Sequence, residues 1–265
     1  MLEEIDEKKE FDSFSKAGKT GWGEYRKIEG LYELKSVYIE SLLQTRRILI
    51  LNENKQREYE MLQNSRGLKD GSDNIADLVK RVKSTLEKLE QSDLVRIKEL
   101  ESLLEEEYKN IKVVAEMGFR TPRLLNYYKK QEIDLVKGYD VVKLNVIVGK
   151  KLGFDVEVKD FNDYENLDLS DINDVDLFLS YHVMEHISRP DLTLKKIYKH
   201  LTPGAMLHVE IPIEPDGPRI RYGHLFPFHE KDMHLFLVDA GFKILHFSNK
   251  THPGGSRAER YLVRK

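Results

Sequence analysis

Hydrophobic residues recur every three or four positions over much of the first 108 residues, which is the spacing of amphipathic helices. Residues 30–51 carry one such stripe, and residues 75–91 and 94–110 carry two more. The stripes consist of Leu31, Leu34, Val37, Tyr38, Leu42 and Ile48, then Leu78, Val82, Leu86 and Leu89, then Leu94, Ile97, Leu100 and Leu104. We expect a helical segment over residues 1–108 that either caps the following domain or forms a homodimer interface.

After residue 110, short apolar runs alternate with amphipathic segments. The expected strands are 111–118, 132–140, 155–161, 175–180, 206–212, 242–248 and 257–265. The expected helices are 122–130, 144–153, 189–201 and 230–241. This alternation over 109–265 predicts an α/β domain with a parallel, doubly wound, Rossmann-like sheet. Only NKTHPGGS separates the last two strands, so we expect them to form an antiparallel pair.

The composition of the chain limits the kinds of molecule that it is expected to bind. The 43 Lys and Arg residues nearly balance the 46 Asp and Glu residues, which gives a net charge of −3 and does not favour a nucleic acid partner. Because the chain has no cysteine, disulfides, thiolate metal sites and a cysteine nucleophile are excluded. The polar start and the lack of a long apolar run predict a soluble, cytoplasmic protein without a membrane partner.

The segment LSYHVMEHISRP contains His182, Glu185 and His186 in the order His-x-x-Glu-His. One class of zinc peptidases has this spacing on a helix, where both histidines project from one face. Here His182 directly follows the apolar run VDLFLS, so we place it at the exit of a strand. We therefore expect no metal site in this segment.

Two further stretches accompany the strand exit DLFLSYHVMEHIS, namely LTPGAMLHVEIP and GHLFPFHEKDMHLFLVDAGFKIL. In this order they resemble the class I S-adenosylmethionine-dependent methyltransferases, in particular the branch that methylates small molecules. The resemblance covers residues 111–265. It implies a seven-stranded sheet with an antiparallel last strand, S-adenosylmethionine as the cofactor and a small-molecule acceptor.

The same resemblance assigns the first cofactor loop to EMGFRTPR. Glu116 matches the acid of the family's loop and Gly118 its first glycine, whereas Arg120 and Pro122 replace the other two glycines. Glycine lets the backbone approach a ligand closely, so this loop should differ in shape from the usual one. Arg120 is expected either to form a salt bridge with the methionine carboxylate of the cofactor or to fill the space in the loop.

The remaining cofactor residues follow later strands. The resemblance assigns Asp140 to the ribose hydroxyls, Asp160 to the adenine amine, and Phe161 to the adenine ring through packing and its backbone amide. Ser180 lies at the strand exit and completes the expected set. Taken singly, Asp160 reads equally as a solvated turn residue and Phe161 as a core residue.

The acceptor is expected to meet the sulfonium methyl beside Tyr181 and His182, with His182 positioning or deprotonating it. The loop 214–230 is the expected acceptor wall, and it offers Arg219, Arg221, Tyr222 and His224. Two arginines beside aromatic residues suit a phosphate or carboxylate, although a solvated surface loop would have the same composition.

The chain's size, long N-terminal helices and GFRTP loop also resemble the pyridinol methyltransferases of iron–guanylylpyridinol cofactor biosynthesis. Such an acceptor would carry a phosphate or nucleotide, while sugar and antibiotic precursors are alternatives. A different function is a non-catalytic binding module that keeps the fold but no longer holds the cofactor.

Overall fold

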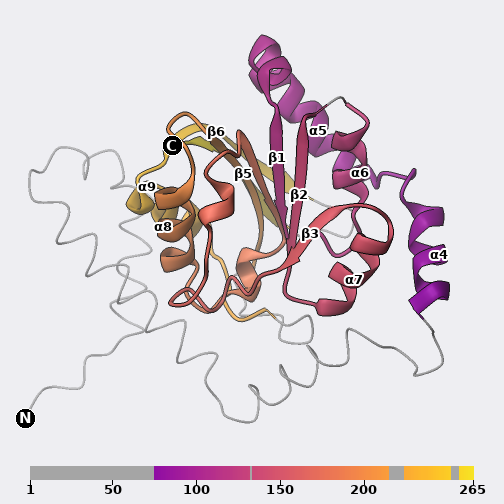
Figure 1. Ribbon diagram of the computed structural model, residues 1–265. Coiled ribbons are helices and arrows are strands. Elements are labelled where there is room, and N and C mark those ends of the chain that lie inside the picture. Colours follow the sequence, from indigo (N-terminus) through magenta and orange to yellow (C-terminus); the bar gives the residue numbers. More distant parts are fainter. Residues whose placement is uncertain (1–74, 132, 215–223, 252–256) are drawn as a thin grey trace, which may run out of the picture. The chain divides into compact units, whose positions relative to one another are not determined.

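The computed structural model describes residues 75–131, 133–214, 224–251 and 257–265 (Figure 1). Among the described residues, two α-helices precede the sheet, namely α4 (Ile75–Thr85) and α5 (Gln91–Leu104), followed by the 3₁₀ helix η1 (Glu105–Asn110). The expected helix 30–51 and the side chains Arg219, Arg221 and Tyr222 lie outside the described residues. Within the part of the chain that the structure describes, no helix combines the length and apolar character needed to cross a membrane.

Seven strands form one mixed sheet in the order β3-β2-β1-β4-β5-β7-β6. The strands are β1 (Val113–Met117), β2 (Leu135–Asp140), β3 (Asp155–Val158), β4 (Leu177–Tyr181), β5 (Met206–Ile213), β6 (Lys243–Thr251) and β7 (Arg257–Arg264). Pairs among β1 to β5 are parallel, whereas β7 runs antiparallel to both β5 and β6. The predicted α/β sheet with an antiparallel last strand is confirmed.

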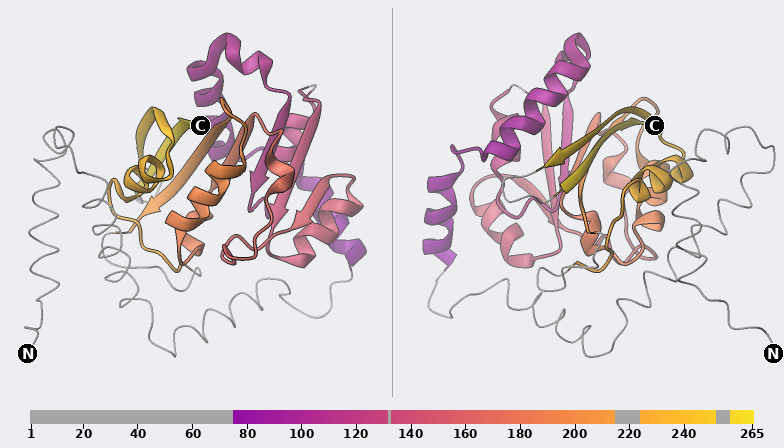
Figure 2. Two further views of the ribbon diagram at one scale, coloured as in Figure 1. Left: turned by 60° about the vertical axis from the view of Figure 1, so that its left-hand side comes forward. Right: turned by 180° about the vertical axis from the view of Figure 1, so that it is seen from behind.

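The remaining helices follow the strands in the expected alternation. They are α6 (Arg123–Lys129), α7 (Lys143–Lys151), α8 (Pro190–His200) and α9 (Asp232–Ala240). Figures 1 and 2 show α5 and α6 on one face of the sheet and α8 and α9 on the other. The central strands are buried on both faces and read as continuous apolar runs, whereas the edge strand β6 alternates between exposed and half-buried residues.

The stripe on α5 belongs to the core of the sheet. Ile97, Leu100 and Leu104 are buried in one cluster with Val114 of β1 and Leu179 of β4. Leu94, which the pattern placed on the same stripe, is 38% exposed. This helix therefore packs as a cap on the sheet, while the predicted boundary at residue 108 and the homodimer stay predictions.

We expect Leu100→Ala to lower the free energy of unfolding by about 2–5 kcal/mol, because it removes a fully buried side chain between α5 and the sheet. The matched substitution on the same helix is Leu94→Ala, which should cost less than about 0.5 kcal/mol at this exposed position. Urea denaturation of both variants measures the difference. Equal, small losses would mean that α5 does not pack on the core in solution.

Candidate active site

The turns that follow β1, β2 and β4 lie at one edge of the sheet, because parallel strands end on the same side. Gly118 follows β1, Asp140 ends β2, and His182 follows β4. The sequence-predicted cofactor and catalytic residues are thus brought to a common edge, which is where ligands bind in open α/β sheets.

Gly118 lies where the turn after β1 contacts the turn after β4. Its φ of +72° lies in the left-handed region. A Cβ atom at this position would lie 2.4 Å from Cγ2 of Val183, which follows the β4 exit. Both the backbone conformation and the space therefore require glycine here. The next glycine positions of the family's loop hold Arg120, itself at φ +43°, and Pro122, which precedes α6.

Asp140 joins the loop after β1 to the loop after β2. Its carboxylate accepts hydrogen bonds from the backbone N–H of Arg120 at 2.9 Å and of Val142 at 2.8 Å. The Asn145 side chain donates a third bond at 3.2 Å. Burial raises the pKa of this carboxyl despite these bonds. The acid therefore has a structural role in both loops, and its contact with the ribose stays a prediction.

Glu116, on β1, is a buried acid that the sequence assigned to the cofactor. Burial and the nearby charge of Asp93 raise its pKa to about 8, against the opposing effect of Arg96 and Arg123. At neutral pH the side chain is therefore mostly a protonated carboxylic acid. Its Oε2 has no hydrogen-bond partner among the described residues, and neither does Oγ of the fully buried Ser180.

The predicted adenine residues differ in their surroundings. Asp160 is exposed, and its Oδ1 accepts the N–H of Asn162 at 2.9 Å. Phe161 is buried, with its ring centroid 6.2 Å from that of Tyr139 and 6.4 Å from that of Phe178. This favours core packing for the Phe161 ring, which was the alternative interpretation, and leaves Asp160 able to reach a ligand.

His182 lies at the strand exit, as the sequence predicted, with φ +56°. Its Nε2 is 3.0 Å from Oε1 of Glu210 and its Nδ1 is 3.3 Å from Oε1 of Glu185. Burial alone would lower the pKa of His182, but the bonds to the two carboxylates raise it to about 9. At neutral pH the ring is an imidazolium, which favours positioning of the acceptor over the predicted role as a base.

Tyr181, the other predicted catalytic residue, is directed into the protein. Its hydroxyl oxygen lies 2.6 Å from Nδ1 of His208, within hydrogen-bond distance. Burial and the charge of Arg260 lower the pKa of His208 to about 3, so that ring is neutral at neutral pH. The guanidinium of Arg96 lies 4.4 Å above the tyrosine ring. Burial raises the pKa of Tyr181 well above its usual value. These contacts give Tyr181 a structural role, and its catalytic role stays a prediction.

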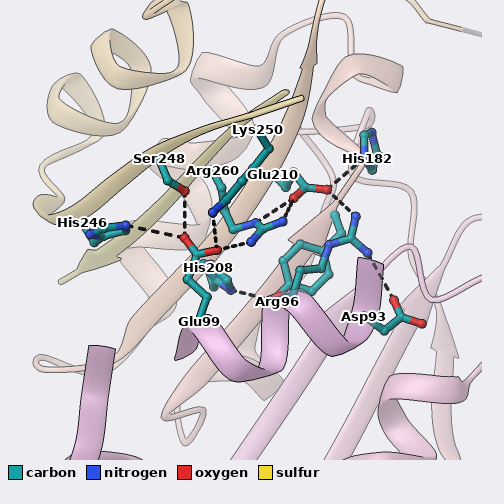
Figure 3. Close-up of polar contacts among 11 residues, drawn as sticks. Asp93, Arg96, Glu99, His182, His208, Glu210, His246, Ser248, Lys250 and Arg260 are labelled. Atoms are coloured by element: carbon teal, nitrogen blue, oxygen red, sulfur yellow. Dashed lines mark hydrogen bonds and ion pairs between the residues drawn. The ribbon is translucent and has the colours of Figure 1, made fainter. Parts of the chain in front are cut away.

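Sequence reasoning missed the polar network beneath His182 (Figure 3). Glu210 of β5 is fully buried and accepts hydrogen bonds from Arg96 of α5 and Arg260 of β7. Arg260 also bonds Glu99 of α5, which accepts from Ser248 of β6 at 2.7 Å. The available signal was Glu210 itself, a charged residue inside the apolar run MLHVEIP.

The turn after β4 is the 3₁₀ helix η3 (Met184–His186), so His182 and His186 do not share an α-helix as the peptidase site requires. Of the four predicted acceptor residues, only His224 is described. Its Nδ1 lies 2.7 Å from Oε1 of the buried Glu214. The ring stacks edge-to-face on His186, with centroids 4.9 Å apart.

A comparison with protein families matches residues 115–209 to the family described as "Methyltransferase domain". The match begins in β1, contains the turns at Gly118, Asp140 and His182, and ends in β5. The match covers 95 of the 265 residues.

Solved structures of methyltransferases share the fold of this domain. A putative methyltransferase from Bacillus halodurans is 13% identical over 66% of this chain and 99% of that chain, with a TM-score of 0.50. An S-adenosylmethionine-dependent methyltransferase from Archaeoglobus fulgidus is 17% identical over 65% and 93%, with a TM-score of 0.49. A comparison with curated protein sequences finds no match.

The stability of the protein should show an unusual pH dependence that comes from Glu116. The pKa of this acid is about 8 in the fold and 4.5 in its ordinary state. Between these values the unfolded chain releases a proton that the fold retains, so the free energy of unfolding falls as pH rises. The slope is about 1.4 kcal/mol per pH unit. We expect Glu116→Gln to remove this slope and to be more stable than the native protein at pH 8.

Urea denaturation from pH 5 to pH 8, without cofactor, measures the effect. Glu165→Gln, in an exposed loop, is the matched control and should keep the native slope. If Glu116→Gln and the native protein lost stability in parallel over this range, Glu116 would be ionised in the fold.

Proposed function

We propose that the chain transfers the methyl group of S-adenosylmethionine to a small-molecule acceptor at the edge where β1, β2 and β4 end. The observation that carries the proposal is the turn at Gly118. Its backbone is held in the left-handed region against Val183, where any side chain would collide. Tight glycine turns of this kind, at the ends of parallel strands, are where cofactor loops bind their ligands in open α/β sheets.

The described residues fit the chemical groups of the cofactor. The partnerless oxygen of Glu116 suits the ammonium of the methionine moiety, which would favour the ionised form of this acid. We assign the methionine carboxylate to Arg120 and the ribose to Asp140, whose oxygens can accept further bonds. Asp160, the Phe161 amide and Ser180 remain the proposed adenine side.

When bound, S-adenosylmethionine would supply an electrophilic methyl group. The acceptor atom would bond to this carbon as its bond to sulfur breaks, and S-adenosylhomocysteine would leave. The protein contributes alignment and exclusion of water. Both ring nitrogens of His182 face carboxylates, so we propose that its positive charge attracts an anionic group of the acceptor and that it removes no proton from the acceptor. The proton of a hydroxyl acceptor then leaves to water or to another group.

The acceptor class is the finer part of the proposal. An imidazolium at the strand exit favours an electron-rich or anionic acceptor, and Arg219, Arg221, Tyr222 and His224 remain its proposed wall. A pyridinol-type cofactor precursor that carries phosphate or nucleotide has these properties. An uncharged sugar precursor would gain less from the imidazolium and the two arginines, so we rank the pyridinol class first.

The rival function, a binding module without cofactor, draws support from Asp140. Its three internal hydrogen bonds give this acid a structural reason to be present even without a ribose. The orphaned oxygen of Glu116 still favours the cofactor, because a buried polar atom without a partner is costly. A binding measurement separates the two functions.

Calorimetric titration with S-adenosylhomocysteine should show binding of the native protein, and Gly118→Ala should weaken it by at least about tenfold. The methyl group would collide with Val183 and displace the turn. Gly204→Ala is the matched control, since Gly204 also has positive φ (+91°) but no atom within 4 Å of the added Cβ. Its affinity should equal that of the native protein, and circular dichroism checks that both variants fold.

No binding by the native protein at millimolar ligand would favour the module. Equal affinity of Gly118→Ala and Gly204→Ala would remove the turn at Gly118 from the cofactor site.

Mass spectrometry of mixtures with pyridinols, nucleotides and sugars should reveal the acceptor by the gain of one methyl group. With that acceptor, His182→Ala should leave cofactor affinity unchanged and slow single-turnover methyl transfer by about 10-fold to 10²-fold, less than the loss of a general base. His200→Ala, on α8, is the control and should react at the native rate. Full activity of His182→Ala would remove this residue from the reaction.

A further inference from the structure

Three side chains beside the β4 exit come together in the arrangement of a metal site. Glu185, His186 and His224 each offer one ligand atom, and these atoms lie within 4.8 Å of one another. Glu185 and His186 come from the turn η3, and His224 comes from a segment 38 residues later in the chain. We propose that these residues bind a divalent first-row transition-metal ion, contrary to the expectation from sequence that the segment binds none.

The carboxylate of Glu185 has one oxygen that can bind a second partner. The side chain is 1% exposed, and its Oε1 bonds His182. Its Oε2 is buried and has no hydrogen-bond partner among the described residues. A carboxylate oxygen in this state is costly unless a donor or a cation contacts it. A metal ion beside His186 and His224 would supply that contact.

His224 is oriented in the way that metal-binding histidines usually are. The Nδ1 atom of its ring faces Oε1 of Glu214 at 2.7 Å, and Glu214 is itself 3% exposed. A carboxylate behind one ring nitrogen fixes the tautomer and directs Nε2 toward the metal. The peptide N–H groups of Leu225 and Phe226 donate to the Glu185 carbonyl at 2.7 and 3.0 Å, which fixes this segment on the turn.

The donor set restricts the class of ion. Two imidazoles and one carboxylate suit Mn²⁺, Fe²⁺, Co²⁺, Ni²⁺ or Zn²⁺, whereas Mg²⁺ and Ca²⁺ prefer oxygen ligands. Three protein ligands leave coordination positions open, as in metal sites that bind a further molecule. This site differs from the zinc peptidase site because His182 is not a ligand and bonds Glu185 and Glu210 instead.

The test uses the full chain with any purification tag removed and with metal stripped by a chelator. Titration against a chromogenic chelator should show one equivalent of Zn²⁺ bound, and Co²⁺ should give a visible absorption band. Mg²⁺ at the same concentration should not compete. Less than about one tenth of an equivalent of bound Zn²⁺ would overturn the proposal, whatever the outcome with S-adenosylhomocysteine.

Variants assign the ligands. His186→Gln and His224→Gln should each lower Zn²⁺ affinity by more than about 100-fold, and Glu214→Gln by about 10–100-fold through loss of the orienting bond. His200→Gln is the control for adventitious binding by histidine. In the native protein the His200 ring bonds the Lys196 carbonyl. Native affinity in both His186→Gln and His224→Gln would overturn the assignment.

Should either variant fail to fold, the melting temperature of the native protein keeps the proposal testable. Zn²⁺ should raise it in proportion to the logarithm of concentration above the dissociation constant, while Mg²⁺ should leave it unchanged. Equal shifts with the two ions, or no shift with Zn²⁺, would count against a site built from imidazoles.

Discussion

The fold depends on one buried carboxylate. Glu210 lies in the middle of the sheet with no exposed surface, and burial alone would prevent it from ionising. A hydrogen bond from His182 and the charges of Arg96 and Arg260 hold its pKa far below the usual range. Because these partners come from the β4 exit, α5 and β7, the charge balance is complete only when all three elements are in place (Figure 3). Removing one partner of such a buried group typically costs about 3–5 kcal/mol.

This requirement explains why α5 has two inward-facing stripes. Ile97, Leu100 and Leu104 bury their apolar side chains on the sheet near its amino end. Arg96 and Glu99 bring charge to Glu210 and Arg260, which the apolar stripe alone could not satisfy. The hydrophobic contacts hold the helix on the sheet. The ion pairs fix its position along the strands, since they tolerate little displacement.

The local pattern of apolar and polar residues predicts much of the architecture. Apolar runs identify the strands because both faces of the central sheet are covered, and the short link before β7 requires an antiparallel pair. Gly118 was assigned through the resemblance of EMGFRTPR to the methyltransferase loop, and its positive φ explains why glycine stands there.

Roles that depend on distant partners were not recognisable from sequence. The pattern shows neither that Tyr181 meets His208 nor that the Phe161 ring lies against Phe178. It also treats Arg96 and Glu99 as solvated charges of an amphipathic helix, although both bond charged residues more than 100 positions later in the chain. Ion pairs between distant segments become visible only when the topology brings the segments together.

His182 connects the structural network to the chemistry at the edge of the sheet. One ring nitrogen faces Glu210 beneath it, and the other faces Glu185 in the turn that also carries His186. The imidazolium therefore compensates the negative charge of both carboxylates. Its side chain is 37% exposed, at the edge where we propose that the acceptor binds. A charge placed by the fold in this way needs no rearrangement when an anionic group arrives, which is the condition for electrostatic preorganisation. The same coupling explains why β4 ends at Tyr181. The left-handed residue that follows turns the imidazole back between the two acids, where a continued strand would carry it past them.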